Sequence, residues 1–209
     1  TAYESVKILH EAGVPRGALQ FVPGSGRLGA ALVAAPETAG VMFTGSTEVA
    51  RQIQAQLSEC LSPAGKPIPL IAETGGQNGM IVDSSALAEQ VVADVIASAF
   101  DSAGQRCSAL RVLCLQDDVA DRTLAMLKGA LKELRIGRTD RLNIDVGPVI
   151  SEQAKAEIDQ HIERMRSLGC KVEQLPLPDT AALGTFVPPT IIELKQMSDL
   201  TREVFGPVL

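Results

Sequence analysis

The chain has 209 residues, of which 45% are hydrophobic and 21% charged, a balance typical of folded globular proteins and not of disordered ones. Its formal net charge of -6 and its aromatic content of 3% leave neither the basic surface nor the stacking side chains of a nucleic-acid-binding domain. No run approaches the roughly 20 apolar residues of a membrane span, so we expect this segment to contact neither nucleic acid nor membrane.

Helix and strand patterns alternate along the chain, which predicts an α/β fold. In the first 73 residues they predict a βαβαβ arrangement, half of a Rossmann-type domain. The expected elements are a helix over 1–12, a strand over 18–22, a helix over 26–35, a strand over 41–43, a helix over 47–59 and a strand over 69–72.

The paired glycines of Thr74-Gly75-Gly76 interrupt this pattern and predict a hinge between domains. We therefore expect one domain over 1–75 and a second over 76–209. In the second we expect strands over 78–82, 109–115, 170–174 and 186–193, and helices over 86–100, 118–134 and 151–168, the last of them N-capped by Ser151.

Cysteine and histidine usage argues against a metal site and against a disulfide framework. The four cysteines include no CxxC pair, and with only two histidines the spacing of a zinc site is missing. Without a secretory signal we expect reduced thiols in the cytoplasm. Cys60, Cys114 and Cys170 are expected to be buried structural thiols, the usual state of free cysteines.

Two glycine-containing turns are candidates for binding an anion. The stretch 24–29 fits G-x-G-x-x-G, but no acidic residue ends the following strand, so close helix packing is favoured over a pyrophosphate site. The stretch 43–47, Phe-Thr-Gly-Ser-Thr, is the better candidate, because free N–H groups at a helix N-terminus attract anions. Simple N-capping by Ser46 or Thr47 explains the same residues equally well.

Glu73 and Cys107 are the strongest candidates for catalytic residues. Glu73 follows an apolar strand, where partial burial would raise its pKa and make it a general base; the alternative is a surface glutamate at a hinge. Cys107 follows Gly104-Gln105-Arg106 on a loop between an apolar helix and an apolar strand. It is a candidate nucleophile whose thiolate Arg106 would favour if its charge faced the sulfur. Neither His10 nor His161 has a setting that indicates a Cys–His pair.

Four stretches, in order and in spacing, resemble the motifs of the NAD(P)-dependent aldehyde dehydrogenase superfamily. They are Phe43-Thr44-Gly45-Ser46, Glu73-Thr74-Gly75-Gly76, Gly104-Gln105-Arg106-Cys107 and Glu203-Val204-Phe205-Gly206-Pro207-Val208. More narrowly, residues 72–78 and 98–112 look like the L-glutamate γ-semialdehyde (1-pyrroline-5-carboxylate) dehydrogenases that form one module of bifunctional proline-degrading enzymes. The likeness covers the whole chain.

The resemblance implies a fold and a reaction. The fold would be aldehyde dehydrogenase-like, with the C-terminal part of a Rossmann-type NAD-binding domain over 1–75 and an incomplete α/β catalytic domain over 76–209. The reaction would be the NAD-dependent oxidation of L-glutamate γ-semialdehyde to L-glutamate. Cys107 would attack the aldehyde, its backbone N–H would supply one oxyanion donor, and Glu73 would activate the water that hydrolyses the thioester.

The resemblance also implies binding roles for residues around these two. Ser46 would contact the cofactor pyrophosphate, with Thr44 and Gly45 near the nicotinamide. Glu203 would bind the nicotinamide ribose and Phe205 would pack against the ring. Ser108 and Arg106, on either side of the nucleophile, would contact the substrate.

We expect the chain to be a fragment of a longer polypeptide, since it starts at Thr1 without a methionine and stops within a strand-like stretch. The family's oxyanion asparagine and adenosine-binding lysine would precede it, and its substrate-carboxylate loop and oligomerisation strands would follow it. The parent would be a homo-oligomer, and its other parts can include a proline dehydrogenase module. Three alternatives stay open: a catalytically silent folding or binding unit, an aldehyde dehydrogenase with another substrate, and a CoA-acylating enzyme, against which Glu73 argues.

Overall fold

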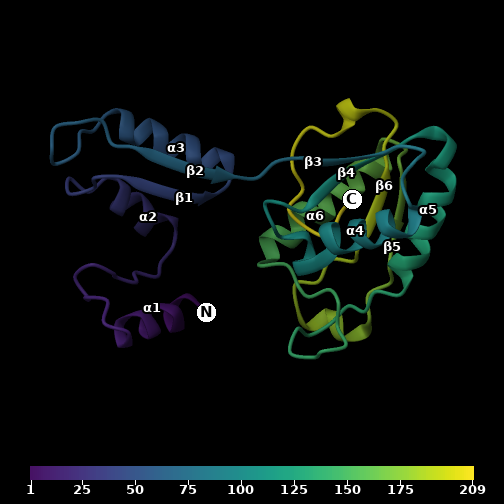
Figure 1. Ribbon diagram of the computed structural model, residues 1–209, viewed down its shortest axis with the longest axis horizontal. Coiled ribbons are helices and arrows are strands. Elements are labelled where there is room, and N and C mark those ends of the chain that lie inside the picture. The colour runs from purple at the N-terminus through teal and green to yellow at the C-terminus, as the bar shows by residue number, and fades with distance from the viewer. The chain divides into compact units, whose positions relative to one another are not determined.

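A two-stranded parallel sheet organises residues 1–74 in the computed structural model, which describes residues 1–209 (Figure 1). Strands β1 (Val41–Gly45) and β2 (Leu70–Thr74) are joined by helix α3 (Thr47–Ser58), which makes one βαβ unit. The register places Thr44 opposite Glu73. Helices α1 (Ala2–Glu11) and α2 (Gly26–Val33) precede the sheet, as the sequence predicted.

The strand predicted over 18–22 does not form, so the βαβαβ prediction is wrong. Residues 14–25 adopt no regular element, and Phe21 and Val22 are 41% and 50% exposed. A strand needs a neighbouring strand to pair its backbone N–H and C=O groups. In this part of the chain β1 and β2 pair only with each other.

Residues 75–209 contain two further strand pairs. Strands β3 (Asn78–Val82) and β4 (Leu110–Leu115) are parallel, whereas β5 (Lys171–Gln174) and β6 (Thr190–Glu193) are antiparallel. Helices α4 and α5 pack against each other and against β4, and α6 packs against β5 (Figure 1). These helices span Ala88–Phe100, Asp117–Lys132 and Glu152–Ser167, and the short 3-10 turns span Asp101–Gly104, Asp179–Leu183 and Met197–Asp199.

The core of this second unit is built on the apolar face predicted for α4. Five α4 residues, recurring at helical spacing, are buried: Val91, Val92, Val95, Ala99 and Phe100. They share one hydrophobic cluster with Leu127 and Leu131 of α5 and Ile162 of α6. The expected cap of α6 is confirmed, because Ser151 Oγ accepts a hydrogen bond of 3.1 Å from the N–H of Ala154.

The last predicted strand is shorter than expected. It begins at Thr190 instead of residue 186, because Pro188 and Pro189 have no N–H to donate to a ladder.

An open groove of about 580 Å³ lies between β4 and β6. Residues 207–209 run along β6, where the Thr190 N–H donates to Pro207 O at 2.9 Å and the Leu209 N–H donates to Thr190 O at 2.9 Å. Cys114 lines this groove and is exposed, so its prediction as a buried thiol is wrong. That prediction is confirmed for Cys170, which is buried, and holds only in part for Cys60, which is half-buried.

No helix of the structure combines the length and the hydropathy needed to cross a bilayer.

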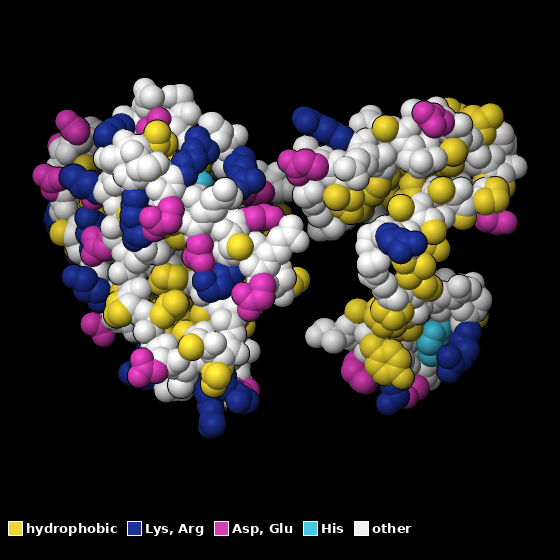
Figure 2. All heavy atoms as spheres, turned by 180° about the vertical axis from the view of Figure 1, so that it is seen from behind, with side chains coloured by type: hydrophobic (Ala, Val, Ile, Leu, Met, Phe, Trp, Pro, Cys, Tyr) yellow, Lys and Arg dark blue, Asp and Glu magenta, His cyan; other side chains and the backbone are white.

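The two units differ in how much apolar surface they bury. Between residues 1 and 74 only Ala50, Leu57 and Ile68 are buried hydrophobics, and α1 and α2 bury no residue at all. Figure 2 shows hydrophobic side chains gathered on this smaller unit, whereas side chains of both charges are interspersed over the larger one. Few buried apolar contacts mean a low free energy of local unfolding.

We therefore predict that limited trypsin digestion of the 209-residue chain cuts first within residues 1–74 and leaves a resistant product covering 75–209. Intact-mass analysis of a time course identifies the products. Digestion in strong denaturant, where both units are unfolded, is the control and should remove the difference. Equal rates of cleavage in the two units under native conditions would contradict the burial argument.

Candidate active site

The loop that carries Cys107 begins with a left-handed turn at the end of α4. Ser102, Ala103 and Gly104 have φ values of 56°, 54° and 65°. For non-glycine residues this conformation costs about 1–2 kcal/mol each, so it persists only where the surroundings impose it. Ala103 and Gly104 are buried, and the turn redirects the chain so that Cys107 lies exposed between α4 and β4.

Gly104 brings the backbone of this loop against the segment that carries Glu203. A Cβ at Gly104 would overlap the carbonyl oxygen of Gly206 and would lie 2.8 Å from Ala99 O. Only glycine allows both the positive φ and this close approach.

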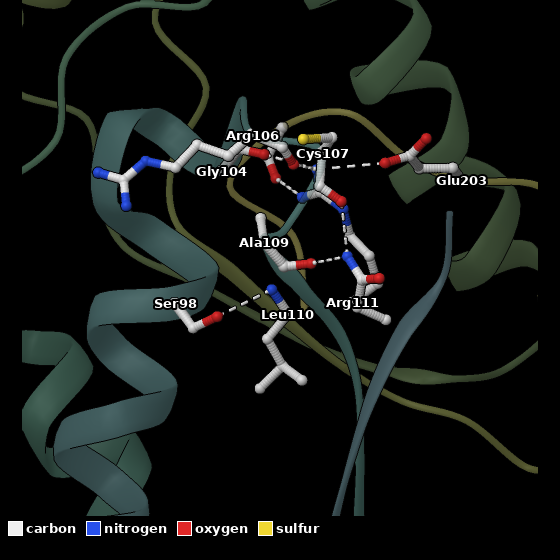
Figure 3. A network of polar contacts seen from close by, with 10 residues as sticks. Ser98, Gly104, Arg106, Cys107, Ala109, Leu110, Arg111 and Glu203 are labelled. Carbon is white, nitrogen blue, oxygen red and sulfur yellow. Dashed lines mark hydrogen bonds and ion pairs between the residues drawn. The ribbon is translucent and has the colours of Figure 1, made fainter. Parts of the chain in front are cut away.

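The side chain of Arg111 holds the two segments together. The side chain is 3% exposed, and its guanidinium donates hydrogen bonds to Gly104 O at 2.6 Å, Arg106 O at 3.2 Å and Gly206 O at 3.0 Å (Figure 3). Burial lowers the pKa of Arg111, while the charge of Glu203 acts in the opposite direction. An arginine keeps its proton under such conditions, so this is a buried fixed cation.

Glu203 lies beside this cation, but one of its carboxylate oxygens has no hydrogen-bond partner. Its Oε1 is 3.5 Å from Arg111 Nη2, yet it is buried and has no hydrogen-bond partner. A Cβ at Gly75 would overlap the Glu203 carboxylate, so glycine at that position makes room for it. The Phe205 ring centroid lies 5.3 Å from the Arg111 guanidinium carbon, a cation–π contact.

The carbonyl groups on both sides of Cys107 are bound. Arg111 holds the carbonyl of Arg106, and Asn78 Nδ2 donates to Cys107 O at 2.8 Å and to Ala109 O at 2.9 Å. The backbone N–H of Cys107, in contrast, donates no hydrogen bond in the structure. The thiol is thus presented on a backbone whose orientation is fixed and whose N–H is free.

The two predicted substrate contacts flank the nucleophile on the exposed loop. Arg106 donates from Nε and Nη2 to Ser102 Oγ, each at 3.1 Å, and lies 3.8 Å from Asp101. Figure 3 shows its guanidinium turned away from the Cys107 sulfur, so the idea that its charge faces the thiol is wrong. Ser108 is exposed beside Cys107. Substrate binding by either residue stays a prediction.

The candidate residues of the smaller unit meet at the carboxyl edge of its sheet. Thr44 and Gly45 end β1, and Glu73 pairs in register with Thr44. Ser46 is the N-cap of α3, and its Oγ accepts from the Val49 N–H at 3.2 Å. Glu73 is exposed, not partly buried as expected. Glu73 belongs to the smaller unit and Cys107 to the larger one.

Neither histidine forms a pair with Cys107. His10 Nδ1 donates to Val14 O at 2.9 Å. His161 is buried in α6, and its pKa is lowered, first by burial and then by the charges of Arg164 and Arg202. No group of three or more His, Cys, Asp or Glu residues lies together in a way that could hold a metal ion.

Asn78 and Arg111 are the site residues that the sequence analysis missed. Arg111 left a signal, since it is the one charged residue in the apolar strand β4. A charge in such a strand must be compensated by partners. Asn78 left none, because a polar residue at the start of a strand is ordinary.

The parallel strand pairs and the exposed thiol on a fixed loop are features of α/β enzymes with a cysteine nucleophile. A model of the aldehyde dehydrogenase family matches residues 1–209, and the chain therefore belongs to this family.

Three individual proteins illustrate the relationship. The bifunctional protein PutA of Rhizobium meliloti is 66% identical over the whole chain, which covers 17% of that protein. The 1-pyrroline-5-carboxylate dehydrogenase of Anoxybacillus flavithermus is 33% identical, again over the whole chain and 41% of the relative. A double mutant of betaine aldehyde dehydrogenase from Staphylococcus aureus, solved in complex with NAD+, is 26% identical with a TM-score of 0.89, over 98% of this chain and 41% of that one. The chain thus spans about a sixth of the first relative and two-fifths of the other two.

The contact between Gly104 and Gly206 generates a stability prediction. Gly104→Ala should lower the free energy of unfolding by about 2 kcal/mol or more, because the new Cβ combines a positive φ with a backbone overlap. The matched control is Gly129→Ala on the exposed side of α5, where a Cβ meets nothing within 4 Å. There the free energy of unfolding should rise by about 0.5–1 kcal/mol. Urea unfolding measures both, and a Gly104→Ala variant as stable as wild type would contradict the geometry.

Proposed function

We propose that the chain is part of an NAD-dependent aldehyde dehydrogenase that oxidises L-glutamate γ-semialdehyde to L-glutamate. The observation that carries the proposal is the exposed thiol of Cys107 on a loop whose flanking carbonyls are both bound. Family membership supports the reaction class, and a relative named 1-pyrroline-5-carboxylate dehydrogenase supports the substrate. The 1-pyrroline-5-carboxylate of that name is the cyclic form of the semialdehyde.

In the proposed mechanism the Cys107 thiolate adds to the aldehyde carbon, which forms a C–S bond and places negative charge on the former carbonyl oxygen. The free N–H of Cys107 is available to stabilise this charge. Bound NAD would supply the hydride acceptor that converts the thiohemiacetal to a thioester. Glu73 would take a proton from a water molecule whose oxygen attacks the thioester carbon. The C–S bond then breaks, glutamate leaves and the Cys107 thiolate is regenerated.

The residues predicted to bind NAD have the chemistry that this cofactor needs. Glu203 Oε1 is a buried acceptor without a partner, which a ribose hydroxyl would satisfy. Phe205 is 45% exposed and offers a ring face to the nicotinamide. The N-terminus of α3, with Ser46 as its cap and Thr44 and Gly45 before it, favours an anion such as a pyrophosphate. The preference for NAD over NADP rests on the subfamily resemblance.

We propose that this activity belongs to a longer polypeptide, because the chain spans only about a sixth of a relative that is 66% identical to it. The isolated 209 residues should therefore show no turnover. A homo-oligomeric parent, other modules in the same polypeptide and a reducing, cytoplasmic setting belong to the same proposal.

The role of Cys107 is tested by Cys107→Ser in the complete polypeptide. NADH formation from the semialdehyde should fall by at least about 10³-fold, because the hydroxyl is a far weaker nucleophile without a dedicated base. Cys114→Ser, which changes another exposed thiol, is the matched control and should keep wild-type activity. Turnover that survives in Cys107→Ser would refute the assignment.

The role of Glu73 is tested by stopped-flow measurement of NADH in Glu73→Gln. One equivalent of NADH per site should still form in a rapid burst, because hydride transfer precedes hydrolysis. The following steady state should be slower by about 10²–10⁴-fold, since the general base is gone. Loss of the burst, or an unchanged steady state, would show that Glu73 is not the base for hydrolysis. With CoA added to the wild-type enzyme, release of acyl-CoA in place of free glutamate would identify a CoA-acylating enzyme.

A further inference from the structure

Arg111 makes more hydrogen bonds to backbone carbonyls around the nucleophile than an ion pair with Glu203 would require. Its guanidinium donates to three carbonyls, those of Gly104 and Arg106 on the cysteine loop and that of Gly206, 95 positions along the chain. It also lies over the Phe205 ring. The two buried side-chain atoms without a hydrogen-bond partner, Arg111 Nε and Glu203 Oε1, both belong to this cluster. The cluster is therefore arranged around backbone carbonyls and not for ion pairing alone.

The bond from Arg111 to Arg106 O has a consequence for Cys107. Arg106 O accepts from Arg111 Nη2 at 3.2 Å and from the Ala109 N–H at 3.1 Å, so this carbonyl is held from two sides. The structure contains no cis peptide bond, and in a planar trans peptide the C=O and N–H groups point in opposite directions. Holding Arg106 C=O thus fixes the direction of the Cys107 N–H, which has no acceptor of its own.

We propose that Arg111 is a positioning residue that presets the Cys107 N–H as an oxyanion donor and ties this peptide to the segment of Glu203 and Phe205. The proposal rests on the proposed function in so far as Cys107 attacks a carbonyl carbon. Arg111 touches no reacting atom; it acts through the Arg106–Cys107 peptide.

Lysine cannot reproduce this arrangement. The planar fork of arginine reaches carbonyls of two segments at once and stacks on an aromatic ring, whereas an ammonium group is a compact point charge. Arg111→Lys therefore keeps the positive charge at position 111 and removes the simultaneous hold on the carbonyls of Gly104, Arg106 and Gly206. It is the variant that separates positioning from electrostatics.

The test compares two reactions of Cys107 in the complete polypeptide. Acylation by p-nitrophenyl acetate develops an oxyanion, whereas alkylation by iodoacetamide displaces iodide and develops none. In Arg111→Lys the acylation rate should fall at least about tenfold, while the alkylation rate stays close to that of wild type. Arg122→Lys is the matched control, because the Arg122 side chain is 72% exposed in the second turn of α5 and pairs with Glu89, and both of its rates should be unchanged.

Each outcome decides the proposal. A selective loss of acylation supports it. Parallel losses in both reactions would show that Arg111 is merely structural, and unchanged rates in both would show that it has no role at Cys107. Either of these two results overturns the proposal. Should Arg111→Lys fail to fold, as judged by its thermal unfolding, the same comparison in Arg111→Gln decides. Failure of the proposed function gives a different result. If the wild-type enzyme does not oxidise glutamate semialdehyde but Arg111→Lys still loses acylation selectively, the role of Arg111 stands and only the substrate changes.

Discussion

The buried guanidinium of Arg111, 2.6 Å from Gly104 O and 3.0 Å from Gly206 O, connects the two segments from which the candidate site of the larger unit is built. One segment carries Cys107 and the other carries Glu203 and Phe205. Both reach the same place because one side chain binds the backbone of each, and because Gly104 lets the two backbones touch. Without this cation the buried carbonyl of Gly104 would lose its donor, a costly arrangement, whereas Gly206 O would keep the Val208 N–H at 2.8 Å.

Core packing at the start of the cysteine loop explains how its strained conformation persists. The left-handed conformation at Ser102 and Ala103 disfavours folding locally, and only the surrounding packing can impose it. Phe100 and Ala103, each 1% exposed, anchor the start of the loop in the core formed by α4, α5 and α6. Strain held by a rigid core is typical of functional sites, because it presents a reactive group in one orientation. Here the group presented is the Cys107 thiol.

Much of the fold could be predicted from the sequence because apolar residues recur at helical or strand spacing, as in α4 and β4. The prediction failed where structure depends on distant partners. Residues 18–22 have strand-like composition but no strand beside them, and Cys114 faces an unfilled groove. The candidate nucleophile could be selected from its local motif, whereas the direction of Arg106 and the contact from Arg111 to Gly206 could not. A side chain's rotamer and a contact across 95 positions leave no local pattern.

If Cys107 is the nucleophile, it and none of the other three thiols forms a covalent bond to an aldehyde substrate. The most direct test is peptide mass spectrometry of the complete polypeptide in its Glu73→Gln form, quenched in acid after mixing with NAD and glutamate semialdehyde. We predict a glutamyl thioester on the peptide that contains Cys107, with the peptides of Cys60, Cys114 and Cys170 unmodified. An adduct on any of those three, or NADH formation without an adduct on Cys107, would contradict the account.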